Sequence, residues 1–163
     1  MDSNQITRAM EELYKRLNNL LSHQRANRGD DNILHDTCKS ILSIYEEHSD
    51  KLKGSPQELE SLASCMCSKG VIELIESALS LYEDYPSMER GAETQSLCLT
   101  ILSLLSETDT GCNAIRDKEL TTSSCVRWMI LEKYGESIFG AGLLERMQKH
   151  IPSEEDMIRL CSI

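Results

Sequence analysis

The chain has 163 residues and a net charge of −10, and only 4% of its residues are aromatic. Its length suits one helical domain, residues 1–163, with its own hydrophobic core. With three prolines and almost no alternation of apolar and polar residues, the chain lacks the two-residue period of β-strands. The predicted fold class is therefore all-α.

The charge is unevenly placed along the chain. Residues 1–30 carry five basic and four acidic side chains, whereas the remainder carries 12 basic and 23 acidic ones. Nucleic acids are bound by clustered lysine and arginine, so we expect no nucleic-acid partner. The acidic balance favours a basic or amphipathic segment of another protein as the partner; the alternative is that it only keeps the fold soluble.

The lengths of the apolar segments and the positions of the cysteines predict the cellular location of the protein. The first ten residues are polar, and no apolar run approaches the ~20 residues that a membrane span needs. Most of the seven cysteines fall on apolar helix faces, where cysteine behaves as a small hydrophobic residue. We expect reduced thiols, no membrane association, and a cytoplasmic or nuclear location.

The first predicted helix, residues 3–28, is amphipathic and ends at Gly29. Five basic residues lie off its apolar seam, which repeats with spacing 4-3-4-3. We expect this helix to pack on, or cap, the rest of the domain; the alternative is that the seam between Ile6 and Leu21 joins two copies. The seam residues are Ile6, Met10, Leu13, Leu17 and Leu20.

Further helices are expected at 31–52, 56–69, 71–84, 92–107 and 112–120. The clearest local signal is Ser55-Pro56-Gln57-Glu58, where Ser55 fits an N-cap and Glu58 can close a capping box. Gly70 fits the position that ends a helix. Pro86 disfavours helical backbone angles at the preceding residue, Tyr85, so the helix before it is expected to end there. The helices within residues 68–113 are too apolar to stand alone, so neighbouring helices should cover both.

The rest of the chain is predicted to form a helix over 125–134, a weaker one over 143–150, and a last one after the N-cap Ser153. About eight helices, most of them short, are therefore expected. A short helix, a bend, a longer apolar helix and a tight turn follow one another, which is typical of stacked helical repeats.

One unit of this pattern resembles an armadillo or HEAT-like repeat. The resemblance rests on Gly70-Val71-Ile72, on the leucine-rich stretch 97–105 and on Asn113 near the start of the next unit. It implies a first helix over 59–69, a second over 71–82 and a third over 92–107, with partial units on either side. The loop 83–91 is longer than the family pattern, and no glycine bend occurs between Ile115 and Cys125. The alternative fold is a compact non-repeat helical bundle.

The chain carries none of the common sequence motifs of nucleotide-binding, hydrolase or metal sites. Cys65 and Cys67 are two apart on a predicted helix and point in different directions, so they cannot chelate one ion. Cys125, near Arg127, is the best candidate nucleophile, but plain packing is favoured. We predict no catalytic, cofactor-binding or metal-binding residue, and no enzyme activity.

The predicted function is that of a protein-interaction scaffold or adaptor, which holds a partner peptide or helix along a groove formed by successive third helices. The alternatives are a compact regulator or antagonist of the host-defence or apoptosis type, and a protein that self-assembles through its first helix. Trp128 is a candidate interface anchor, for which a core role is the alternative. The candidate partner-binding residues are Lys39, Glu93, Gln95, Ser96, Thr100, Ser103 and Trp128.

Overall fold

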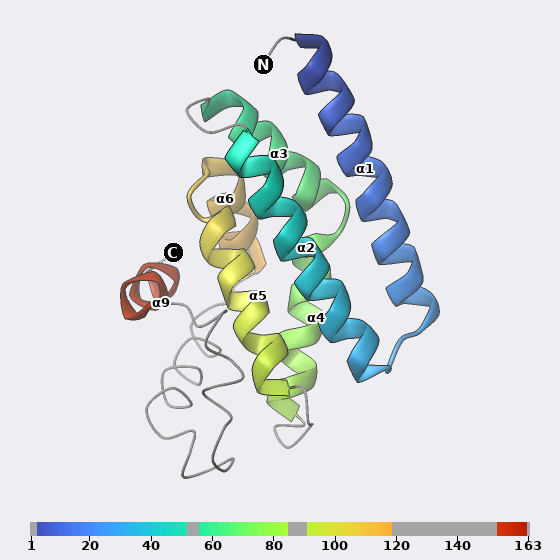
Figure 1. Ribbon diagram of the computed structural model, residues 1–163. Coiled ribbons are helices and arrows are strands. Elements are labelled where there is room, and N and C mark those ends of the chain that lie inside the picture. The colour runs from blue at the N-terminus through green and yellow to red at the C-terminus, as the bar shows by residue number, and fades with distance from the viewer. Residues whose placement is uncertain (1–2, 52–55, 85–90, 119–152, 163) are drawn as a thin grey trace.

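The computed structural model describes residues 3–51, 56–84, 91–118 and 153–162. Every regular element in these ranges is an α-helix and none is a strand, which confirms the predicted all-α class. Figure 1 shows a stack in which α1 runs opposite to α2, and α4 opposite to α5. The helices are α1 (Ser3–Ala26), α2 (Asp31–Lys51), α3 (Pro56–Ser68), α4 (Val71–Asp84), α5 (Gly91–Leu105), α6 (Asp109–Lys118) and α9 (Glu154–Cys161).

Local signals set the ends of the first helices, as predicted. Gly29 and Gly70 both have a positive φ, 91° and 95°, which side chains with a Cβ rarely adopt. After Gly29, the Asp30 carboxylate accepts a hydrogen bond from the Ile33 N–H at 3.1 Å and so caps α2. Pro56 is the first residue of α3, where its missing N–H costs nothing.

The start of α6 differs from the prediction. The helix begins at Asp109, three residues before the expected start at Cys112. The reason is a local cap, because the Thr108 hydroxyl accepts a hydrogen bond from the Gly111 N–H at 3.0 Å. α5 correspondingly ends at Leu105, which leaves three residues between the two helices.

α5 is the helix around which the described part of the fold is packed. It contacts α2, α4, α6 and α9, and in Figure 1 it lies beside α2 with α4 behind the pair. Its buried side chains therefore point in several directions instead of forming one stripe. They include the apolar Leu97, Cys98, Leu99, Ile101, Leu102 and Leu105 and the polar Thr94, Gln95, Ser96 and Ser103.

α1 packs along the edge of the stack against α2 and α3 (Figure 1). Leu13, Leu17 and Leu21 are buried in this contact, and Met10 and Leu20 are partly buried. An exposed ion pair between Arg16 and Glu47, 3.1 Å apart, also joins α1 to α2; a pair of this kind adds at most about 1 kcal/mol. Burial of the leucines is thus the main force holding α1 in place.

Several predictions fall on residues that the structure does not describe. These are the capping residue Ser55, the Tyr85-Pro86 break, the helices over 125–134 and 143–150, and the side chains of Ile6, Cys125 and Trp128. The last helix is described, and its predicted cap is confirmed: the Ser153 hydroxyl accepts a hydrogen bond from the Asp156 N–H at 3.1 Å.

Candidate partner-binding surfaces

The residues predicted to face a groove are distributed over α2 and α5, and most of them are engaged within the chain. Lys39 is exposed on α2. Glu93 is half-buried, and its carboxylate lies 3.5 Å from Nε2 of the buried His35. Half-buried Thr100 donates a hydrogen bond to the Ser96 carbonyl oxygen at 2.9 Å.

The other three described candidates, Gln95, Ser96 and Ser103, are buried. α9 covers part of α5 at Ser103. The Arg159 guanidinium donates hydrogen bonds to the Ser103 carbonyl oxygen at 3.1 Å and to its hydroxyl at 2.7 Å, and Leu160 beside it is fully buried. The polar side of α5 at this point is therefore closed by the chain's own C-terminal helix, and a role for these residues in partner binding stays a prediction.

The apolar seam of α1 is likewise used inside the chain. Leu13 and Leu17 have no exposed surface in the single chain. For self-assembly through this seam α1 would first have to leave α2, at the loss of the buried contacts of Leu13, Leu17 and Leu21, each worth about 1.5–3 kcal/mol. The structure thus offers a smaller apolar surface for self-assembly than the sequence suggested.

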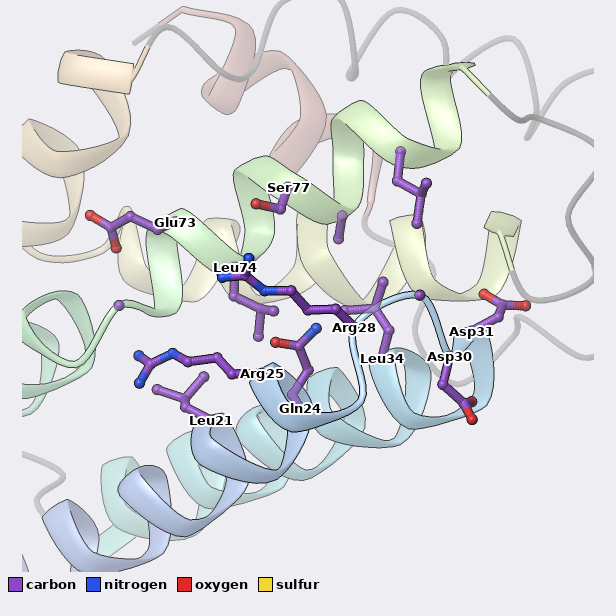
Figure 2. Close-up of a pocket in the computed structure, with 14 residues that line it drawn as sticks. Leu21, Gln24, Arg25, Arg28, Asp30, Asp31, Leu34, Glu73, Leu74 and Ser77 are labelled. Atoms are coloured by element: carbon purple, nitrogen blue, oxygen red, sulfur yellow. The ribbon is translucent and has the colours of Figure 1, made fainter.

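A pocket that the sequence did not predict lies between the C-terminal half of α1, the turn into α2 and one side of α4. Figure 2 shows its lining residues converging from these three segments. Its volume is about 530 Å³, within the range of roughly 300–1,000 Å³ that is common for binding sites. Apolar side chains line its interior: Leu21, Leu34, Leu74, Ala78 and Leu81.

The rim of the pocket is polar and carries charges of both signs. Arg25 and Arg28 stand one turn apart near the end of α1, and Figure 2 shows the Arg28 side chain reaching across the pocket toward Leu74. The Asp30 carboxylate is held by the α2 cap described above. No carboxylate that the structure describes forms an ion pair with either arginine.

The pocket escaped prediction because its two walls are far apart in the sequence. Arg25 and Arg28 are two of the five basic residues off the apolar seam of the first helix, and Leu74 belongs to the apolar stretch within residues 68–113. Their meeting depends on the positive φ of Gly29 and Gly70, which turn α2 and α4 back across the stack. The one local signal was a pair of arginines just before a helix-ending glycine.

Two thiols in the described part of the chain, those of Cys67 and Cys98, have surroundings that lower their reactivity. Cys38 and Cys98 are buried with their sulfurs 3.8 Å apart. The neighbouring Cys38 thiol and burial raise the pKa of Cys98 well above 9.0, and burial raises the pKa of Cys67 to about 11. Such thiols are poor nucleophiles near neutral pH because little thiolate is present.

Within the described residues, no three of the histidine, cysteine, aspartate and glutamate side chains gather as a metal site would require. Neither does any described helix combine the length and apolar character of a membrane span.

Comparison with known proteins identifies no relative: no family model, curated protein or solved structure matches the chain. The resemblance to armadillo and HEAT-like repeats therefore stays a prediction. The described helices do occur near the expected positions, with α3, α4 and α5 where the first, second and third helices of one unit were placed.

Proposed function

We propose that the protein is a non-enzymatic interaction module, and that a segment of another protein binds in the pocket between α1 and α4. The pocket itself is the observation that supports this proposal. It combines an apolar interior with a charged rim, and this is the usual composition of a site that receives side chains from a partner. The predicted scaffold function is kept, and its binding surface moves from α5 to the α1–α4 pocket.

The chemistry of the described residues also favours binding over catalysis. The described thiols with raised pKa values are held in or against the core, and none of the described residues that line the pocket is a cysteine or a histidine. Arginine, aspartate, glutamate and leucine around a cavity suit recognition of a partner surface. The five described cysteines are free thiols, so we place the interaction in a reducing compartment, the cytoplasm or the nucleus.

Filling the pocket tests this proposal. Ser77 is exposed on α4 and lines the pocket, whereas Ser80, also exposed on α4, does not line it. Ser77→Trp should block partner capture in a cross-linking pull-down, and Ser80→Trp, which adds the same side chain outside the pocket, should not. If the two variants and the wild-type chain capture the same proteins in the same amounts, the pocket is not the binding site.

A further inference from the structure

The two arginines of the pocket indicate the charge of its occupant better than the net charge of the chain does. Arg25 and Arg28 lie on its rim without an ion pair to any described carboxylate. Arginine is the residue best suited to hold a carboxylate, because its planar guanidinium offers two parallel N–H donors. Three buried leucines, Leu21, Leu34 and Leu74, line the same pocket.

None of the three acidic residues that are described on the rim forms an ion pair with these two positive groups. The Asp30 carboxylate accepts from the Ile33 N–H, and Figure 2 shows Asp30 and Asp31 pointing away from both guanidinium groups. Glu73 is nearer: a Cβ added to Gly70 would be 3.6 Å from Arg25 Nη2 and 3.8 Å from a Glu73 oxygen, so this carboxylate lies close to Arg25 although the two form no ion pair. Gly70 and Arg25 both line the pocket, and Figure 2 shows Arg28 reaching across it.

The position of Arg25 and Arg28 near the end of α1 accounts in part for their charge, since positive side chains near a helix C-terminus interact favourably with the helix dipole. It does not explain why the Arg28 side chain extends over an apolar interior. A long side chain lying over leucines covers them with its methylene groups and leaves its guanidinium at the mouth. This arrangement forms an apolar slot with arginine side chains at its entrance.

From these observations we propose that the occupant is an acidic amphipathic helix of a partner protein, with apolar side chains in the pocket and a glutamate or aspartate one turn away on Arg25 and Arg28. This inference rests on the proposed function and adds the chemistry of the partner. It differs from the expectation of a basic partner, which came from the net charge of −10. We give the two arginines more weight than the net charge of the chain, because at physiological salt charges more than about 8 Å away are largely screened and because Asp30 and Asp31 point away from both guanidinium groups in Figure 2.

Two fluorescent peptides test the charge of the occupant. Both are about 16 residues long, since shorter helices are marginal in water, and both carry leucines at i and i+4. One has glutamates beside the leucines on the same face, and the other has lysines at the same positions. Fluorescence anisotropy measures their affinity for the full chain, and backbone amide chemical shifts at Gly70, Leu74 and Ala78 report binding at the pocket.

The charge-reversal variant Arg25→Glu/Arg28→Glu has a matched control on the same helix. Arg8 and Lys15 are exposed and do not line the pocket, so Arg8→Glu/Lys15→Glu changes the net charge by the same amount elsewhere. We expect the wild-type chain and the control variant to prefer the glutamate peptide about tenfold, as two exposed charge pairs allow. The pocket variant should reverse this preference, and added salt should reduce it. Circular dichroism verifies that each variant is folded.

Each other outcome overturns the inference. Equal affinity for the two peptides, with amide shifts at the pocket, would remove the charge preference and leave the proposed function standing. A preference of the wild-type chain for the lysine peptide would reverse the assignment. If neither peptide shifts the pocket amides at about 1 mM, the acidic helix is excluded as the occupant, and the Ser77→Trp capture experiment then decides separately whether the proposed function also falls.

Discussion

Gly111 lies close to Leu105, the last residue of α5, and its replacement by alanine tests the packing of that corner. It lies in the first turn of α6. A Cβ at this position would be 2.5 Å from the backbone carbon of Leu105, closer still to the Leu105 oxygen, and 2.9 Å from the Thr108 hydroxyl. Because the obstacle at Leu105 is backbone, no change of side-chain rotamer can relieve it.

Two opposing effects determine the size of the change. Alanine is favoured over glycine within a helix by about 0.5–1 kcal/mol. Forcing an extra methyl group against packed atoms costs about 1–3 kcal/mol, and a shift of α6 away from Leu105 would also weaken the Thr108 cap, worth about 1 kcal/mol. We therefore expect Gly111→Ala to lose about 2 kcal/mol of unfolding free energy and to lower the Tm by roughly 4–8 °C.

Urea unfolding followed by circular dichroism measures this loss, with Gly29→Ala as the control. Gly29 has a positive φ but no atom within 4 Å of an added Cβ, so it should lose only about 1 kcal/mol, the cost of a left-handed conformation. A Gly111→Ala chain that unfolds at the wild-type urea concentration or above would refute the close approach of α5 and α6.

Three further predictions concern groups whose partners are known. Hydrogen bonds from the Thr110 hydroxyl and from the first backbone N–H groups of α6 hold the pKa of Glu60 below 4.5, so Glu60 contributes stability that is present above pH 4.5 and lost as the pH falls through the lowered value. Glu60→Gln should flatten the acid side of the stability–pH curve from urea titrations, and an unchanged slope would contradict the α3–α6 contact. Because its pKa is raised and it is buried, Cys98 should resist iodoacetamide at pH 8 in the folded chain and react only in concentrated urea, as mass spectrometry can determine. Arg159→Ala removes two hydrogen bonds to Ser103 and should weaken docking of α9 by about 1 kcal/mol; hydrogen exchange in α9 should then accelerate about fivefold, and unchanged exchange would show that these bonds do not hold α9.

The predicted groove shows where reasoning from residue type alone fails. Serine and threonine on α5 suggested a polar, accessible face, yet Ser96 and Ser103 are buried. Thr100 and Ser106 donate their hydroxyls to carbonyl oxygens of the preceding turn, at 2.9 and 2.6 Å. A hydroxyl satisfied by its own helix can be buried at little cost, so small polar residues do not by themselves mark a surface.

The sequence by itself determined the helical class and most helix ends, because these depend on contacts spanning three or four residues. Gly29 and Gly70 end helices through their own backbone angles, and Asp30 and Ser153 start helices through hydrogen bonds to N–H groups three residues ahead. A pattern within one turn of chain is sufficient to predict each of them.

Only the tertiary structure decided which surfaces are closed and which remain open. α9 closes α5 at Ser103 through a contact between residues 56 apart, and the Glu60 carboxylate caps a helix that begins 49 residues later. The pocket likewise requires Arg28 of the α1–α2 turn and Leu74 of α4 to meet. Such contacts follow from how whole apolar faces pack, and many packings satisfy the same helical pattern, so no local spacing could have specified them.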